Sequence, residues 1–264
     1  MTPRIEINGL PADAPALAFL AQVNYGHFTS MQVRDGRVQG IEWHLDRLER
    51  GTRRLFGIAL DRDCVRAWMR QAVGGGSASL RVTVFSRHLD RARLERPVEI
   101  DVLVAAQPAR APERSPLRAR SVVHERALPE VKHVGTFDLL HHWREARLAG
   151  FDDVVFTTRT GAIAEGSIWN IGFWDGEAVI LPDAPSLHGV TSRLVEAGLA
   201  TLGVPCRRRE VRAGAYTGLV AAFAMNSGSA YRPIVAIDEC PFADDPRLAA
   251  LIDAACATQP WEAL

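Results

Sequence analysis

Apolar and polar residues alternate over short distances along the first hundred residues, as they do in a small mixed domain. Apolar or β-branched residues run together or alternate, as in strands, at 4–8, 28–33, 80–85 and 98–104. Apolar residues recur at helical spacing in 44–56 and 64–73, and a glycine follows each of these segments. The pair Asp35-Gly36 predicts a hairpin turn, after which 37–43 returns as a strand. This order predicts a small α+β unit.

The composition changes between residues 107 and 120, where three prolines and the absence of hydrophobic periodicity predict a linker. Further strands are predicted after it at 154–158, 168–174, 178–181 and 219–225, with a helix over 190–202. We therefore predict an α/β (α+β) protein with a small N-terminal domain (1–106), a linker (107–120) and a larger C-terminal domain (121–264). A cleft between two such domains is a favoured place for a small-molecule site.

The charge and composition of the 264 residues exclude several classes of function. Thirty-one basic residues balance thirty-one acidic ones, so no overall basic field exists to attract nucleic acid or an anionic membrane. The apolar runs are far shorter than the roughly 20 residues of a membrane-spanning helix, and the first residues lack the apolar core of a signal peptide. The four cysteines are scattered, which indicates neither a metal site nor a disulfide framework. We expect a cytoplasmic protein.

Among the thirty-one basic residues, thirty are arginine and only one is lysine, Lys132. Arginine can replace lysine wherever only charge and solvation matter. It cannot do so where a deprotonated amine must act as a nucleophile, because a guanidinium stays protonated and forms no imine with an aldehyde. Composition alone leaves open whether Lys132 is such a nucleophile or a lysine that remains by chance without a function. The neighbouring sequence is needed to distinguish the two.

Four motifs occur in order along the chain: His44-Leu45-Asp46-Arg47-Leu48, Val131-Lys132-His133, the segment 161–170 with Glu165 and Asn170, and Leu187-His188-Gly189-Val190-Thr191. Together they resemble the class IV aminotransferases, which are fold-type IV pyridoxal-phosphate enzymes. This family includes branched-chain and D-amino-acid aminotransferases and 4-amino-4-deoxychorismate lyase. The resemblance extends over most of the chain, and it implies a two-domain fold with the cofactor in the cleft.

The resemblance also implies roles for individual residues toward pyridoxal 5′-phosphate. Lys132 would form the Schiff base and then carry the proton between the substrate and the cofactor. Glu165 would pair with the pyridine nitrogen. The phosphate would be bound by the following residues: Arg47, Val190, Thr191, Asn226 and Ser227. Asn170 is interpreted as structural, with its amide tying neighbouring backbone together.

The residues for the substrate match the family less well. The segment 25–32 lacks the usual acidic stretch, and its Phe28-Thr29-Ser30 is closer to the lyase, so Phe28 and Ser30 are candidate substrate contacts. Gln32 stands where the lyase has an arginine. Arg87 and Arg91 are candidates for binding a substrate carboxylate, although they also fit solvated hairpin charges.

We predict an aminotransferase that moves an amino group between an amino acid and a 2-oxo acid, because transamination needs only the residues that match. Aminodeoxychorismate lyase, which releases pyruvate and p-aminobenzoate, is the alternative, and a cofactor-binding protein without transaminase activity is a third. The family also implies a homodimer by analogy.

Overall fold

The computed structural model describes residues 3–264, and it divides into two compact units. The first unit comprises Met1–Arg110 together with the short segments Val131–Gly135 and Trp261–Leu264. The second comprises Ala111–Glu130 and Thr136–Pro260. The segment that carries Lys132 therefore belongs to the first unit, although the sequence on either side of it folds into the second.

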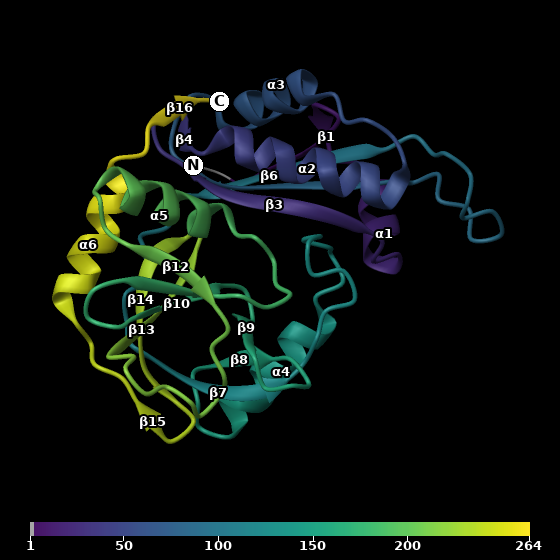
Figure 1. The fold of residues 1–264 in the computed structure, drawn as a ribbon. Helices are drawn as coiled ribbons and strands as arrows, with labels where there is room; N and C mark the ends of the chain where they lie inside the picture. Colours follow the sequence, from purple (N-terminus) through teal and green to yellow (C-terminus); the bar gives the residue numbers. More distant parts are fainter. Residues whose placement is uncertain (1–2) are drawn as a thin grey trace. The chain divides into compact units, whose positions relative to one another are not determined.

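The first unit is built on a five-stranded antiparallel sheet. Its strand order is β2 (Leu10–Pro11), β1 (Arg4–Ile7), β6 (Asp101–Pro108), β5 (Ala78–Phe85) and β3 (Gly26–Val33). Helices α2 (Ile41–Phe56) and α3 (Arg62–Val73) lie along the sheet, and the short α1 (Ala14–Gln22) precedes β3 (Figure 1). Apolar side chains from both long helices and from β3, β5 and β6 form one core. The two helices predicted from spacing are confirmed.

The predicted hairpin turn is present, but the strand predicted after it is wrong beyond residue 39. Asp35 and Gly36 both have positive φ, 49° and 70°, as a two-residue hairpin turn requires. Strand β4 (Arg37–Gln39) pairs with the C-terminal β16 (Trp261–Ala263). Gly40 then takes a left-handed conformation and α2 starts at Ile41, because the helical spacing of apolar residues extends one turn further back than expected.

The second unit contains a nine-stranded mixed sheet. The main path is β12 (Cys206–Arg209), β11 (Val179–Pro182), β10 (Asn170–Trp174), β13 (Ala221–Asn226), β14 (Ser229–Ile237), β7 (Leu117–Val123), β8 (Asp153–Thr157) and β9 (Ile163–Gly166), with β15 (Cys240–Pro241) beside β14. Helices α5 (Val190–Thr201) and α6 (Pro246–Ala257) pack on one face over Phe223 and Tyr231. A second core, around Phe173, fills the other face. Helix α4 (Phe137–Leu148) packs against β8 (Figure 1).

The stretch predicted as a linker is only partly loop. Strand β6 continues to Pro108, and β7 begins at Leu117, where it pairs in parallel with β8 and β14. The buried Leu117 and Ala119 alternate with the exposed Arg118 and Arg120, so one face of the strand is buried. The exposed arginines give this segment the polar composition that predicted a linker. No helix among the described residues is long and apolar enough to cross a membrane.

Candidate active site

The backbone that follows the Lys132 side chain is fixed by β3. The Phe28 N–H donates to the Lys132 carbonyl at 2.9 Å, and the Val134 N–H donates to the Gly26 carbonyl at 2.9 Å. The segment thus lies antiparallel along the edge strand of the first sheet. The Lys132 Nζ lies 5.0 Å from the centroid of the Phe28 ring, and the side chain is half-buried. The structure therefore brings Lys132 and the predicted substrate contact Phe28 together.

Arg47 lies on α2 inside the first unit and is only 7% exposed. Its guanidinium donates to the hydroxyl of the buried Thr29 and, at 3.3 Å, to His44 Nδ1. The Thr29 hydroxyl is 2.7 Å from the same nitrogen. Because Arg47 can only donate, the Thr29 oxygen and His44 Nδ1 both accept from it. Nδ1 therefore carries no proton, and the Thr29 hydroxyl donates to Nδ1. The predicted phosphate ligand is therefore held in place by two uncharged groups.

Two histidines of the first unit are kept neutral by this packing. Burial, followed by the charge of Arg47, lowers the pKa of His27 to about 4. Burial, then Arg47 and then Lys132 lower the pKa of His44 well below its usual value. His27 Nε2 lies 3.1 Å from the Thr52 hydroxyl, which itself donates to the Leu48 carbonyl, so Nε2 is the donor. A Cβ at Gly51 would lie 2.6 Å from the His27 ring, so glycine is required there.

The face of β3 that carries Phe28 also carries Ser30 and meets Arg81 of β5. Ser30 and Arg81 are cross-strand partners, and the Arg81 guanidinium carbon lies 3.6 Å from the Phe28 ring centroid. Arg81 is exposed and has no ion pair within residues 3–264. An exposed cation beside Phe28 and Lys132 can receive an anionic group. The sequence prediction missed it, because a single arginine in a strand has no distinguishing pattern.

The two arginines predicted for the substrate carboxylate lie elsewhere in the first unit. The Arg87 guanidinium donates to Asp101 at 2.9 and 3.0 Å and to Asp13 at 3.2 Å, so it is held by two carboxylates. Arg91 is exposed in the loop between β5 and β6. Within residues 3–264, neither of them makes a hydrogen bond or a ring contact with Phe28 or Ser30.

Glu165 lies on β9 in the second unit and is 7% exposed. Its Oε1 accepts from Arg126 Nη1 at 3.3 Å, and its Oε2 accepts from the Leu187 N–H at 3.2 Å. The side chain of Arg126 is itself 8% exposed, so the ion pair is buried. A buried carboxylate is stable only when it is paired and hydrogen-bonded, and this one is. The sequence prediction missed Arg126, which follows β7 and belongs to none of the four motifs.

The loop before α5 connects Glu165 to the start of that helix. The Asn170 amide donates to the Leu187 carbonyl at 2.7 Å, which confirms its predicted structural role. A Cβ at Gly189 would lie 2.0 Å from Asn170 Oδ1, so only glycine fits there. Val190 and Thr191 follow in the first turn of α5, which has no side-chain cap. The unpaired N–H groups of this turn can bind an anion.

The second predicted phosphate contact lies at the same end of this sheet. Asn170 is the cross-strand partner of Met225, so the turn after β13 is next to the residue that holds Leu187. In that turn Asn226 Oδ1 accepts from the N–H groups of Gly228 and Ser229 at 2.8 and 3.1 Å. Ser227 lies between Asn226 and Gly228 in the sequence. The Asn226 side chain is thus engaged in shaping the turn.

These residues fit the chemistry of pyridoxal 5′-phosphate. Lys132 is the chain's one side-chain amine, and the segment that carries it is hydrogen-bonded to β3 through Lys132 and Val134. Arg47 and the uncapped start of α5 suit a phosphate, since both offer N–H donors and positive charge. Glu165 offers a buried carboxylate, whose two oxygens keep lone pairs beyond the bonds described.

Several solved structures share the fold. A branched-chain aminotransferase from the archaeon Thermoproteus uzoniensis, solved with norvaline, is 19% identical and has a TM-score of 0.81, over 96% of this chain and 93% of that one. A hypothetical aminotransferase from Mycobacterium tuberculosis in its pyridoxal-phosphate-bound form is 19% identical, with a TM-score of 0.75 over 91% and 92%. A protein from Legionella pneumophila, provisionally named a 4-amino-4-deoxychorismate lyase, is 17% identical, with a TM-score of 0.76 over 89% and 91%.

No curated protein matches the chain in sequence at a significant level. The model of the amino-transferase class IV family, however, matches residues 26–237, which include all four motifs. This match confirms the predicted fold class, the prediction of an enzyme and the prediction of pyridoxal 5′-phosphate as its cofactor. The chain belongs to the class IV aminotransferases, the pyridoxal-phosphate enzymes that its motifs resemble.

Proposed function

We propose that this aminotransferase uses Lys132 to bind its cofactor and to move a proton while an amino group passes from an amino acid to a 2-oxo acid. The observation that carries the proposal is the placement of Lys132. Its carbonyl accepts from Phe28 of β3, the Val134 N–H two residues later donates to Gly26, and its amine lies beside the Phe28 ring. A fixed backbone limits the positions that the amine can reach, which is what proton transfer at a defined carbon needs.

The other residues would hold the cofactor within reach of the Lys132 amine. Arg47, the first turn of α5 with Val190 and Thr191, and the turn with Asn226 and Ser227 would bind the phosphate. Glu165 would hold the pyridine nitrogen protonated, with Arg126 and the Leu187 N–H fixing the carboxylate. When bound, the cofactor supplies an electron sink for the carbanion formed at the substrate.

For the substrate carboxylate we propose Arg81 in place of Arg87 and Arg91. Arg81 is exposed on the strand face that carries Phe28 and Ser30, and it has no ion pair among the described residues. Arg87 would first have to leave Asp101 and Asp13. A carboxylate at Arg81 would be near Lys132, since both side chains contact the Phe28 ring.

The test is turnover with a panel of L- and D-amino acids and 2-oxoglutarate. We expect the visible absorbance of the cofactor to shift on addition of one class of amino acid and to return when a 2-oxo acid is added. A protein that binds the cofactor but responds to no amino acid would instead be the binding protein predicted as the third alternative.

The lyase stays a second candidate because of Ser30. This half-buried hydroxyl lies on the same face of β3 as Phe28 and opposite Arg81, where it could act on a substrate. Release of pyruvate and p-aminobenzoate from aminodeoxychorismate, without turnover dependent on a 2-oxo acid, would favour the lyase over the aminotransferase.

A homodimer and a cytoplasmic location are also part of the proposal, and both rest on analogy with the family. Light scattering of the purified protein tests the first, and fractionation of cells tests the second.

A further inference from the structure

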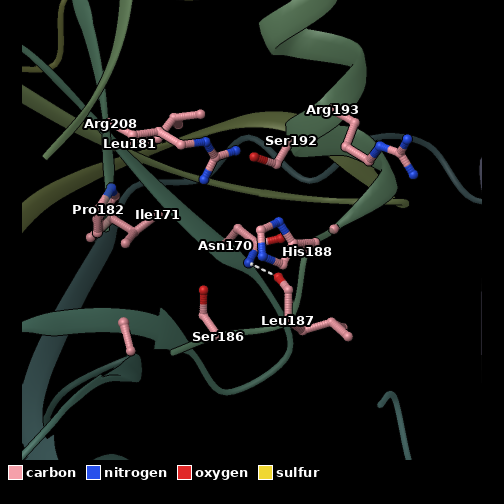
Figure 2. Close-up of a pocket in the computed structure, with 12 residues that line it drawn as sticks. Asn170, Ile171, Leu181, Pro182, Ser186, Leu187, His188, Ser192, Arg193 and Arg208 are labelled. Carbon is pink, nitrogen blue, oxygen red and sulfur yellow. Dashed lines mark hydrogen bonds between the residues drawn. The ribbon is translucent and has the colours of Figure 1, made fainter. Parts of the chain in front are cut away.

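A small pocket lies beside the start of α5 in the second unit. It is lined on the helix side by Gly189, Ser192 and Arg193, and elsewhere by Asn170, His188 and Arg208 among others (Figure 2). It is a small hollow that opens to solvent. The lining includes neither Val190 nor Thr191, the helix residues predicted to contact the cofactor phosphate. The pocket is therefore a separate feature of the same helix end.

Ser192 is the side chain that indicates a ligand. It is the third residue of α5 and only 7% exposed, and its hydroxyl makes no hydrogen bond within the described part of the chain. Figure 2 shows this hydroxyl directed into the pocket. A hydroxyl that opens into a pocket without a protein partner is left to bind a ligand or water. The N–H of Ser192 lies in the first turn of α5, which no side chain caps.

Arg208 brings a fixed positive charge to the same pocket. Its Nε and Nη2 donate to the Glu196 carboxylate at 3.3 and 2.9 Å, which holds the guanidinium in one orientation. Nη1 has no hydrogen bond to another described residue and is left as a donor. Figure 2 shows the guanidinium pointing toward Ser192 from β12. The lining contains two arginines and a histidine but no carboxylate, and Glu196 contacts Arg208 from outside it.

We propose that this pocket binds a small inorganic oxyanion of the phosphate or sulfate type, held by the hydroxyl and N–H of Ser192 and by Arg208 Nη1. The ion would contact the loop 187–189, whose Leu187 N–H holds Glu165. Its binding would stabilise that loop. The proposal goes beyond the function proposed above and does not depend on it.

The experiment measures the melting temperature of the purified protein, freed of excess cofactor, in inorganic phosphate, sulfate, glycerol 3-phosphate and chloride at equal ionic strength. We expect a saturable rise with phosphate and sulfate and none with chloride, because a ligand of the folded state stabilises it according to its concentration over Kd. A rise with glycerol 3-phosphate alone would overturn the proposal of a free inorganic ion.

The decisive comparison uses variants of the pocket. Ser192→Ala, which suits a helix, and Arg208→Gln should each raise the apparent Kd at least about tenfold. Arg207→Gln, which removes the neighbouring exposed charge on β12, should leave it unchanged. If Ser192→Ala and the unaltered protein respond alike, an adventitious ion only is bound and the proposal is wrong. Ser192→Ala decides the question alone if Arg208→Gln does not fold. If the purified protein carried no cofactor on Lys132, the proposed function would be refuted. The comparison of Ser192→Ala with the unaltered protein would still test the oxyanion pocket.

Discussion

Glu165 is fixed by a buried arginine on one oxygen and by a backbone N–H on the other. Its neighbours thus stabilise the charged form without covering the whole carboxylate. The sequence predicts Glu165 because it belongs to a motif, whereas its partner Arg126 is far from that motif in the chain. Arg81 escapes prediction for a related reason, since its position beside Phe28 depends on the register of β3 with β5.

Replacing Glu165 with glutamine keeps the size of the side chain and an acceptor for the Leu187 N–H but removes the charge. We expect the rate of cofactor conversion by the amino acid to fall by roughly 100-fold or more, the range found for groups that control a proton. Stopped-flow absorbance measures this rate. Glu125→Gln is the matched control, because Glu125 is exposed and accepts from the Arg159 N–H. An unchanged rate in Glu165→Gln would refute its role.

Replacing Arg81 with glutamine should raise the KM for the amino acid by about 10- to 100-fold, as loss of a hydrogen bond to a charged group predicts. The melting temperature should change little, because Arg81 is exposed. Steady-state kinetics compare it with Arg91→Gln, an exposed arginine in the next loop. If Arg91→Gln raises KM and Arg81→Gln does not, the substrate carboxylate binds where the sequence first indicated.

At the scale of elements, the contact between α2 and β3 is polar at its centre. Thr29, His44 and Arg47 form one hydrogen-bonded cluster, and His27 with Thr52 forms another. Strand and helix were both predicted from apolar spacing, because their remaining buried residues are apolar. The polar cluster could not be predicted, since spacing shows which face a residue occupies but not which partner it meets.

The neutral histidines of this contact predict how stability depends on pH. The pKa of His27 is about 4 in the folded state, against about 6.5 unfolded, so its contribution is complete above pH 6.5 and is lost as the pH falls toward 4. Between pH 7.5 and pH 5 we expect His27 to lower the free energy of unfolding by about 2 kcal/mol. His44, whose pKa is also lowered, acts in the same direction.

Urea unfolding at pH 7.5, 6.5 and 5.0 measures this dependence. His27→Gln should be less stable at pH 7.5 but should lose less stability on acidification than the unaltered protein. His88→Gln removes an exposed histidine and should keep the full dependence. Equal losses in His27→Gln and His88→Gln would contradict a neutral, buried His27.

At the scale of the whole molecule, the predicted residues fall into two sets. Arg47, Phe28 and Lys132 belong to the first unit, and Glu165, Thr191 and the Asn226 turn belong to the second. The family could be predicted because the motifs are local. The return of Val131–Gly135 to the first unit could not, because this segment is held by backbone hydrogen bonds to β3 that leave no mark on its side chains.

The central claim is that Lys132 carries the cofactor, and one measurement tests it most directly. The purified protein is reduced with borohydride and digested, and the peptides that carry a pyridoxyl-phosphate group are identified by mass spectrometry. The account predicts loss of the visible absorbance band and a label on Lys132, which is the chain's one side-chain amine. Absence of any label, or a label on the N-terminal amine alone, would contradict the account.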